Sequence, residues 1–429
     1  METIFALSTA RGKAGVAVIR VSGPEAGRCV SDLTGKMVRD RVATLCRISD
    51  PTRGHIDTGI ILTFPEGGSF TGEPVAEFQV HGGTASVAAL LNAMEELPYL
   101  RIAQPGEFTR RALENERLDL AQVEGLADLI DAETEVQRRQ AMRLLDGALG
   151  DKAERWRRDL LRAVALLEVT IDFADEEVPV DVAPEVTGLL IGVRDEVAAE
   201  AKGALVAERI RDGFEVAIMG APNVGKSTLL NALAGREAAI TSEVAGTTRD
   251  VIEVRMDMNG LAVTLLDTAG LRETDDHVEG IGIERARMRA RDADLRVLLL
   301  EDADAGLPFE QQKGDIIAVS KSDINDAPGF GISAKTGAGL DELVHRITGE
   351  LETRAAGAMT ATHQRHREAL TLAESHLSDA FSQLELGAEV TELAAHEVHS
   401  AIRALDSLVG RIDVEHILGE IFASFCLGK

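Results

Sequence analysis

The chain has 429 residues, and at about 150 residues per domain this length predicts roughly three domains. Its 45 Lys and Arg against 72 Asp and Glu give a formal net charge of −27, which excludes nucleic-acid binding by bulk positive charge. With 45% hydrophobic and only 3% aromatic residues, the chain is predicted to be an acidic globular protein with few rings on which bases could stack.

The first 115 residues mix strand and turn signals, with AVIRV at 17–21 and EFQV at 77–80 separated by clusters rich in Gly and Pro. This pattern predicts an α+β domain over residues 1–115. From 116 to 211, leucine and alanine recur at the spacing of amphipathic helices, which predicts the first part of a helical domain.

Strand and helix signals alternate over residues 212–352, beginning with the apolar run at 215–219, and predict an α/β domain with a mostly parallel sheet. Helical spacing returns over residues 353–429, the second part of the helical domain. Because neither helical stretch is complete alone, we expect the two to pack together with the α/β domain inserted between them. The predicted fold class is therefore multidomain, α/β and α: an N-terminal α+β domain, a central helical domain and an inserted α/β domain.

The strongest chemical signal is GAPNVGKS at 220–227, which matches the P-loop pattern GxxxxGK[ST] between a predicted strand and a predicted helix. In such a loop the backbone N–H groups surround phosphate oxygens, Lys226 reaches the β and γ phosphates, and the Ser227 hydroxyl holds Mg²⁺. An ordinary glycine turn is the alternative, which the strand–loop–helix context disfavours.

Two further signals describe a GTPase that switches with its nucleotide. A hairpin is predicted around Asn259-Gly260, and its second strand delivers DTAG at 267–270 beside the P-loop. Asp267 is placed to bind Mg²⁺ through water, and the Gly270 N–H to contact the γ-phosphate. Thr247-Thr248 precede the hairpin, where a threonine completes the Mg²⁺ shell only while the γ-phosphate is present.

The base motif departs from the usual pattern. SKSD at 320–323 stands where GTPases have NKxD, and Asp323 is placed to accept from guanine N1–H and the 2-amino group, which adenine lacks. Lys321 covers the base with its aliphatic stem, and SAK at 333–335 offers the Ala334 N–H to the guanine carbonyl. Because Ser320 is shorter than the usual Asn, we expect guanine preference with weakened affinity. A polar loop after a strand is the alternative.

The α/β domain is predicted to be a trimmed Ras-like domain. Only about a dozen residues separate Leu300 from Ile316, and about ten separate Asp323 from Ser333, too few for the two helices usually found there.

Leu271 follows DTAG directly, where many small GTPases carry a Gln that orients the attacking water. An apolar side chain cannot position water, so another group must do so. The acidic candidates nearby are Glu273, Asp275, Asp276, Glu279 and Glu284, among which the residues alone do not choose.

The three cysteines, Cys29, Cys46 and Cys426, form no CxxC pair, so they predict neither a disulfide framework nor a zinc site and favour a reducing, cytoplasmic location. Neither a signal-peptide pattern nor an apolar run of about 18 residues occurs, so no membrane association is expected.

Nearly the whole chain resembles one family, the bacterial tRNA-modification GTPases called MnmE or TrmE. The resemblance rests on TIFAL at 3–7, GVAVIRVSG at 15–23, FTGE at 70–73, HGG at 81–83, PGEFT at 105–109, LDLAQ at 118–122, AGTTRD at 245–250, DTAGLRE at 267–273, GIERA at 282–286 and FCLGK at 425–429. The last is similar to the family's C-x-G-K terminus.

The resemblance implies a function that the motifs do not contain. Members of the family act with the flavoprotein MnmG, in a heterotetramer of two plus two chains. They attach an aminomethyl-type (carboxymethylaminomethyl) group to C5 of the wobble uridine of certain tRNAs, with 5-formyl- or 5,10-methylene-tetrahydrofolate as the one-carbon donor. The N-terminal domain is similar to folate-binding aminomethyltransferase folds and forms a homodimer.

Carried over by position, the resemblance assigns Arg20, Glu77, Arg117 and Lys429 to the folate, with charges that suit a glutamyl tail and a pterin edge. Without the family, each would be interpreted as a surface charge or a fold-stabilising pair. Cys426 is a candidate catalytic thiol, and a buried structural cysteine is the alternative.

The resemblance also assigns the hydrolytic groups. Glu279 aligns with the catalytic carboxylate, which acts through water, and a K⁺ ion replaces the arginine finger, with Asn223, Ser242, Val244 and Thr247 as its ligands. Two GTPase domains then dimerise across their nucleotide faces. Ser227 and Thr248 are assigned as the Mg²⁺ ligands, and Lys226 is assigned as a second catalytic residue. The GTP-binding set is Asn223, Val224, Gly225, Lys226, Ser227, Thr228, Ser242, Thr247, Thr248, Asp267, Thr268, Ala269, Gly270, Lys321, Asp323, Ser333, Ala334 and Lys335.

Two other classes share some of these motifs. A ribosome-assembly or signalling switch GTPase needs neither Arg20 and Glu77 nor the C-terminal Cys-x-Gly-Lys, and a P-loop ATPase or kinase needs no guanine preference. Basic runs at 138–143, 152–162 and 285–296 are candidate tRNA contacts, with solvated helix faces of alternating charge as the alternative.

Overall fold

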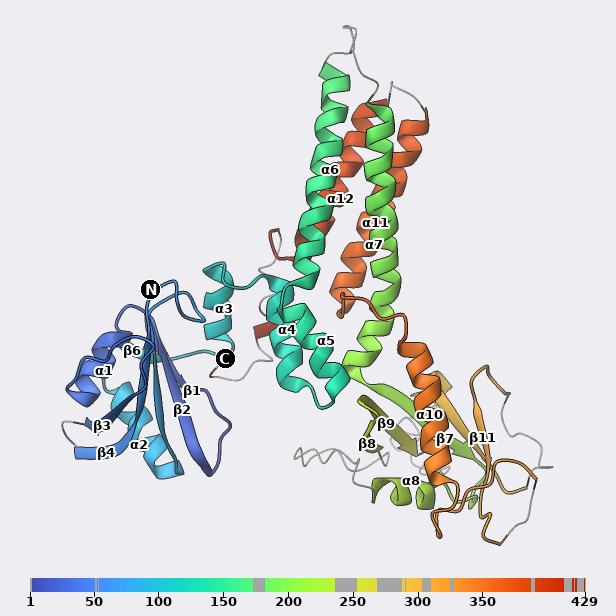
Figure 1. Cartoon of the computed structure of the whole chain (residues 1–429), viewed down its shortest axis with the longest axis horizontal. Helices are drawn as coiled ribbons and strands as arrows, with labels where there is room; N and C mark the ends of the chain where they lie inside the picture. Colours follow the sequence, from blue (N-terminus) through green and yellow to red (C-terminus); the bar gives the residue numbers. More distant parts are fainter. Residues whose placement is uncertain are drawn as a thin grey trace, which may run out of the picture. The chain divides into compact units, whose positions relative to one another are not determined.

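The computed structural model describes residues 2–50, 52, 54–172, 182–235, 253–267, 288–289, 291–302, 310–324, 328–386, 390–412, 419, 421–422 and 428 (Figure 1). Contacts between residues group the chain into two compact units, Met1–Ala127 with Asp406–Lys429, and Asp128–Leu405.

The first unit is built on a six-stranded sheet in the order β3-β4-β5-β2-β1-β6. Its strands are β1 (Thr3–Leu7), β2 (Ala14–Ser22), β3 (Thr44–Asp50), β4 (Gly54–Phe64), β5 (Val75–Gly82) and β6 (Leu100–Ile102). The pairing is antiparallel except between β1 and β6. Strands and helices thus mix in this unit as expected for an α+β domain.

Alternation of side chains along the strands gives this sheet two different faces. Helices α1 (Ala26–Thr34) and α2 (Thr84–Glu95) cover one face, where Ile19 and Phe78 are buried with Met94. On the other face, α3 (Glu107–Glu114) packs Phe108 against Ile4 and Ala6. Residues at the alternate positions of β2 and β5 therefore share a face with α3.

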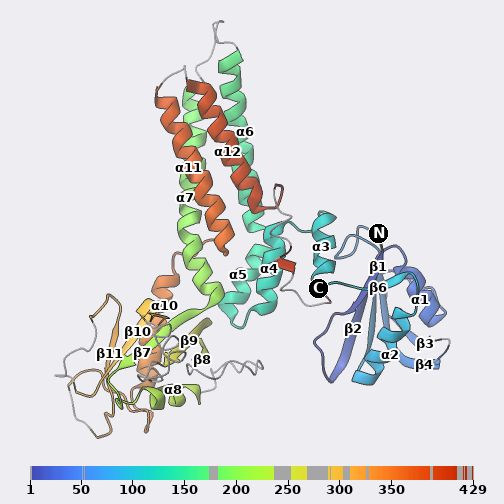
Figure 2. The ribbon, with the colours of Figure 1, turned by 180° about the vertical axis from the view of Figure 1, so that it is seen from behind.

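The helical part comprises α4 (Leu120–Asp131), α5 (Glu135–Leu145), α6 (Ala148–Asp172), α7 (Ala183–Asp212), α11 (Gln364–Leu386) and α12 (Thr391–Leu408). Figures 1 and 2 show α6, α7, α11 and α12 side by side as a bundle. Its buried side chains include Trp156, Val197, Leu377 and Leu405. The two helical stretches, far apart in sequence, pack together as predicted, because each alone would expose its apolar stripe.

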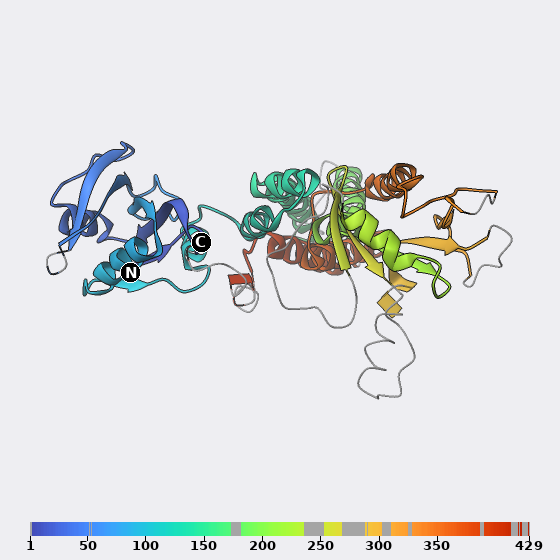
Figure 3. The ribbon, with the colours of Figure 1, turned by 90° about the horizontal axis from the view of Figure 1, so that it is seen from below.

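The α/β part stands between α7 and α11. Its elements are β7 (Phe214–Gly220), α8 (Lys226–Ala234), β8 (Glu253–Met258), β9 (Leu261–Asp267), β10 (Leu295–Leu300), β11 (Ile316–Val319) and α10 (Leu340–Ala355). The sheet order is β11-β10-β7-β9-β8, with β8 antiparallel at the edge and the other strands parallel. Helices α8 and α10 contribute Leu229 and Leu343 to one apolar core with Val216. Figure 3 shows the ribbon of this part from below, with its strands and helices coloured from green to orange.

Three local features of this part bear on the predictions. Asn259 (φ 56°) and Gly260 (φ 87°) both have positive φ, as the predicted two-residue hairpin turn requires. Helix α10 continues to Ala355, so the expected boundary at 352 falls inside it. Between β10 and β11 the described residues, 301–302 and 310–315, contain no helix.

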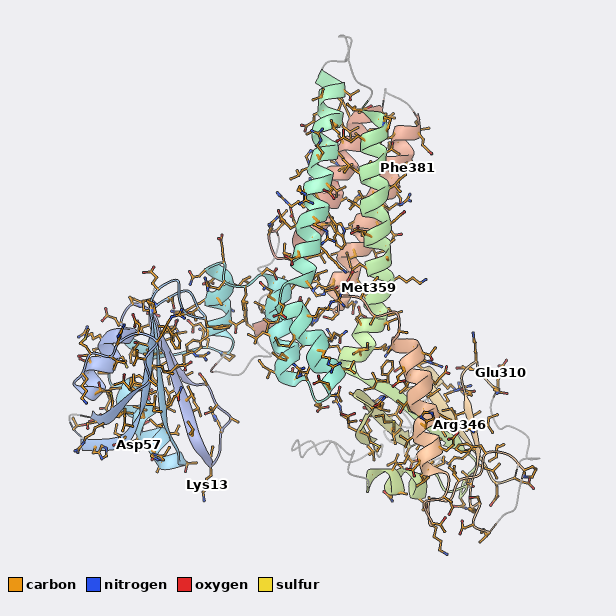
Figure 4. All side chains as sticks on the ribbon, in the orientation of Figure 1. Lys13, Asp57, Glu310, Arg346, Met359 and Phe381 are labelled. Atoms are coloured by element: carbon orange, nitrogen blue, oxygen red, sulfur yellow. The ribbon has the colours of Figure 1, made fainter. Side chains whose placement is uncertain are left out.

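The chain leaves the α/β part through the segment between α10 and α11, which crosses α7. Met359, labelled in Figure 4, packs on Gly203 so closely that a Cβ there would lie 2.2 Å from the Met359 Cγ. None of the helices within the described residues combines the length and apolarity needed to cross a membrane.

Candidate functional site

The loop between β7 and α8 has the backbone of a phosphate cradle. Gly220 lies so close to β10 that a Cβ there would be 2.5 Å from the Leu299 carbonyl oxygen. Asn223 (φ 64°) and Gly225 (φ 108°) have positive φ on either side of Val224, a conformation that turns backbone N–H groups toward one concavity. The concavity opens at the N-terminus of α8, where the helix dipole favours an anion.

Lys226 supplies the cation of this cradle. The residue is 5% exposed, and its Nζ donates to the carbonyl oxygens of Gly220 and Ala221, each at 2.9 Å. Burial lowers the pKa of its ammonium group, while the charge of Asp267 opposes that shift. A phosphate bound in the cradle would therefore add the negative charge that favours the protonated lysine.

Ser227 and Asp267 form the cation side of the site. The Ser227 hydroxyl, in the first turn of α8, donates to the Asp267 Oδ2 at 2.6 Å, and Asp267 ends β9 opposite Ile218 of β7. A hydroxyl and a carboxylate are the hard oxygen ligands that Mg²⁺ prefers. The pair fits Mg²⁺, with Ser227 as the ligand and Asp267 behind it.

The base side follows β11. The Asp323 Oδ1 accepts a hydrogen bond from the Ser333 Oγ at 2.7 Å, so the structure brings together the two motifs that the sequence assigned to guanine. Lys321 has φ 57° and pairs through Nζ with the Glu301 carboxylate at 2.9 Å. Ser320 is 5% exposed, and its Oγ makes no hydrogen bond within the described part of the chain.

Other residues assigned to GTP contribute in different ways. The Val224 side chain packs into the sheet core, so only its backbone faces the loop. Ala334 packs partly on the same core, and Lys335 is exposed. Thr228 follows Ser227 in the first turn of α8.

Ten assigned residues lie outside the described part of the chain, and their roles stay predictions. They are Ser242, Val244, Thr247, Thr248, Thr268, Ala269, Gly270, Glu279, Cys426 and Lys429. Of the K⁺ ligand set, only Asn223 is described.

A second polar site lies in the first unit, on the face of the sheet that α3 covers in part. Strand register places Arg20 of β2 directly opposite Glu77 of β5, and the Arg20 Nη2 lies 3.0 Å from the Glu77 Oε1. The guanidinium carbon is 5.8 Å from the ring centre of Phe70 and 5.9 Å from that of Phe108. Sequence reasoning missed these two rings, although both lie in the FTGE and PGEFT motifs. Arg117 is exposed, and its stem lies next to Gly72.

The carboxylates of those two motifs build a buried ion network. The Arg111 Nη1 donates to the Glu73 Oε2 at 3.0 Å, and its Nη2 donates to the Glu107 Oε1 at 3.0 Å. Arg101 donates to the Glu107 Oε2 at 2.8 Å, and Ser22 donates to Glu73 at 2.7 Å. The network ties α3, and with it Phe108, to the sheet beside Arg20.

Gly428, the one described residue of the C-terminal motif, lies against the end of β1. A Cβ on Gly428 would be 2.2 Å from the Leu7 carbonyl oxygen, and the Ser8 Oγ donates to the Gly428 carbonyl at 3.1 Å. Ala6, one residue before Leu7, pairs with Arg20 in the sheet. Only a glycine allows this close approach.

Phosphate, cation and base groups thus meet at the carboxyl ends of the parallel strands β7, β9 and β11, where open α/β sheets bind ligands. This arrangement is that of a P-loop GTPase, the class to which the chain belongs.

The chain matches two family models, one described as MnmE helical domain over residues 120–426 and one described as GTP-binding protein TrmE N-terminus over residues 3–117. It is 58% identical over 429 residues to the tRNA modification GTPase MnmE of Ruegeria sp. (strain TM1040), with 100% of both chains covered. It is 59% identical over 430 residues to that of Cereibacter sphaeroides (strain ATCC 17025 / ATH 2.4.3), again with 100% of both covered. The chain belongs to the MnmE family of tRNA modification GTPases.

Proposed function

We propose that this chain hydrolyses GTP to drive the modification of tRNA at C5 of the wobble uridine, together with a flavoprotein partner of the MnmG type. The observation that carries the proposal is the Ser227–Asp267 contact of 2.6 Å beneath an intact P-loop, in a chain 58% identical along its full length to a tRNA modification GTPase. Guanine is the base that Asp323 suits best, because its N1–H and 2-amino group can donate one hydrogen bond to each oxygen of the carboxylate.

The N-terminal polar site supports tetrahydrofolate as the one-carbon donor. Arg20, held between Phe70 and Phe108 and paired with Glu77, offers a cation beside two aromatic faces. Folate has an aromatic pterin and an anionic glutamyl tail, which such groups bind. Gly428 lies at the end of the adjoining strand β1, and we propose that Cys426, Lys429 and Arg117 complete the site.

A homodimer through the first unit is part of the proposal. A cavity of about 580 Å³ lies between α2 and the β1–β2 hairpin, lined by apolar residues that include Leu7, Val87 and Leu91. Ile102 at its rim is 51% exposed. A second copy of the chain would remove this apolar surface from water.

Domain limits are proposed as residues 1–115, 116–211, 212–352 and 353–429. The elements α3, ending at Glu114, and α7, ending at Asp212, support the first two limits. The packing of α10 on the α/β core favours moving the third to Ala355.

The test compares tRNA nucleosides by mass spectrometry from cells with the gene, without it, and with the Lys226→Ala variant. We expect the C5-modified wobble uridine to disappear in the second and third cases and to return when the wild-type gene is restored. Unchanged C5 modification in cells that lack the gene contradicts the proposal.

A further inference from the structure

The N-terminus of α5 contacts the residues that lead into β7 and β9, the two strands that end at the nucleotide site. The Val136 N–H donates to the Gly260 carbonyl at 3.3 Å, and the Gln137 Nε2 donates to the Arg211 carbonyl at 2.8 Å. Gly260 directly precedes β9, which ends at Asp267. Arg211 lies three residues before β7, which ends at the P-loop.

Gln137 has two roles at this joint. It forms a capping box with Thr134, in which the Gln137 Oε1 accepts from the Thr134 N–H at 3.2 Å and from the Glu133 N–H at 3.0 Å. Its amide nitrogen is then left to reach Arg211. The residue is 6% exposed, so water has little access to compete for these hydrogen bonds.

Side chains reinforce the same contact with the β8–β9 hairpin. A Cβ on Gly260 would lie 3.1 Å from the Val136 Cγ2, and Val136 packs on the core of the α/β part. The Arg255 guanidinium of β8 pairs with the Glu133 carboxylate at 2.6 Å. The hairpin turn is therefore held to α5 by backbone, apolar and ionic contacts together.

The hairpin is stiff enough to transmit a displacement. Strands β8 and β9 pair without interruption from Glu253 opposite Leu266 to Met258 opposite Leu261. At about 3.3 Å per residue the seven residues of β9 span roughly 20 Å. Strand β9 also pairs with β7, from Val263 opposite Phe214 to Asp267 opposite Ile218. Only a displacement of the hairpin against β7 as a whole therefore moves the Gly260 turn relative to the start of β7, which α5 also contacts.

We propose that Gln137 is a positioning residue that couples the nucleotide site to the helical domain through α5. A ligand at Ser227 and Asp267 that moves β9 relative to β7 changes the separation of Gly260 and Arg211, and α5 follows because it is bonded to both. The contacts form a continuous path, and coupling along it is what the following experiments measure. Only the tRNA readout below rests on the proposed function.

Two isosteric variants separate this role from ordinary stability. Gln137→Glu keeps the volume and the acceptor oxygens of the capping box but removes the donor to Arg211. Gln140→Glu is the matched control, since the Gln140 Nε2 also donates to an α7 carbonyl, that of Ala207, at 2.9 Å. Each variant adds one charge and loses one hydrogen bond, and because Gln137 is buried whereas Gln140 is half-buried, the lower melting temperature is expected for Gln137→Glu.

Hydrogen exchange of the full-length chain, measured over residues 133–140 with GDP and with a non-hydrolysable GTP analogue, tests the coupling directly. In the wild type and in Gln140→Glu we expect at least about a fivefold difference in exchange rate between the two nucleotides, the lower end of typical allosteric couplings. In Gln137→Glu the difference should vanish. Equal exchange with both nucleotides in the wild type, or an undiminished difference in Gln137→Glu, overturns the proposal even if that variant folds poorly.

The second readout is output per GTP hydrolysed. Gln137→Glu should keep the GTP hydrolysis rate of the purified chain within about twofold and lower C5 modification of cellular tRNA at least about fivefold, a coupling loss rather than a catalytic one. Gln140→Glu should keep both. Equal modification in the two variants contradicts the coupling role, whereas absence of modification with the wild type contradicts the proposed function and leaves the exchange test intact.

Discussion

Ser320 is the residue at which the base motif of this GTPase differs from the usual NKxD pattern. Its hydroxyl is buried without a hydrogen bond among the described residues, whereas Asp323 already holds the Ser333 hydroxyl at 2.7 Å. Ser333 therefore occupies one acceptor position of the Asp323 carboxylate and leaves the others for guanine, whereas Ser320 offers the base only a short hydroxyl. We expect this residue to set the nucleotide affinity.

Replacing Ser320 by Asn should strengthen GTP binding by about fivefold, because one added hydrogen bond in a buried site contributes about 1 kcal/mol. The dissociation constants of GTP and GDP, measured by titration of the full-length chain, check this. Ser322→Asn, on the same loop, is the control and should change neither. An unchanged or weaker affinity in Ser320→Asn would show that the site does not use this position for guanine.

Glu279 is the residue on which hydrolysis is proposed to depend. Glu279→Ala should abolish GTP hydrolysis while GTP still binds, and K⁺ should accelerate hydrolysis over Na⁺ in the wild type, since a cation beside the phosphates stabilises transition-state charge. Steady-state hydrolysis in matched K⁺ and Na⁺ buffers measures both effects. Glu273→Ala is the control. Equal rates in the two salts would remove the K⁺ mechanism, and an active Glu279→Ala would remove the carboxylate.

At the scale of elements, α3 depends on Glu107 for its attachment to the sheet. Burial alone would raise the pKa of this carboxyl, but hydrogen bonds from Arg101, the Gln104 N–H and Arg111 lower it to about 2. A carboxyl with a depressed pKa stabilises the fold above its unfolded pKa of about 4.5, and this stabilisation is lost as pH falls toward about 2.

Glu107→Gln should therefore destabilise the first unit by about 1 to 2 kcal/mol near neutral pH, since solvent screens part of the charge interaction, and the difference from the wild type should shrink between about pH 4.5 and pH 2. Calorimetric unfolding of both proteins across this range measures the effect. Glu114→Gln, on the same helix but exposed, is the control and should be neutral. A difference that does not change with pH would mean that Glu107 acts through packing and not through its charge.

For the whole molecule, the net charge of −27 limits the affinity with which the chain alone can bind the polyanion tRNA. Some arginines of the basic runs predicted as tRNA contacts pair with carboxylates of the chain: Arg138 and Arg139 share Glu135, and Arg162 pairs with Glu185. These pairs and the acidic balance weaken the attraction of the chain for phosphates, so the flavoprotein partner that we propose is expected to supply much of it.

The chain alone should therefore bind tRNA at least about tenfold more weakly than the complex with the partner, and its affinity should fall steeply with salt. Fluorescence anisotropy of labelled tRNA, measured between low and physiological KCl with and without the partner, tests this. Tight, salt-insensitive binding by the chain alone would contradict the electrostatic account.

Motifs with short spacing were predictable because their geometry is local. The P-loop, the Asn259-Gly260 turn and the strand before Ser320 appear where the sequence placed them, since backbone conformation and strand polarity follow from neighbouring residues. Arg111, Phe70 and Phe108 were missed, because a buried ion pair or a ring beside a cation is formed by residues distant in sequence and leaves no periodic signal.

The sequence by itself determined the class of chemistry: an acidic, multidomain GTPase with its phosphate, Mg²⁺ and base motifs in order along one α/β insert. Tertiary structure alone decided how that insert contacts α5 and where Gly428 lies. The bonds from α5 to Gly260 and Arg211, and the contact of Gly428 with the end of β1, join residues more than 70 positions apart. Such contacts depend on which surfaces fit together once the cores have formed, and the order of residues along the chain does not encode that fit in any local pattern.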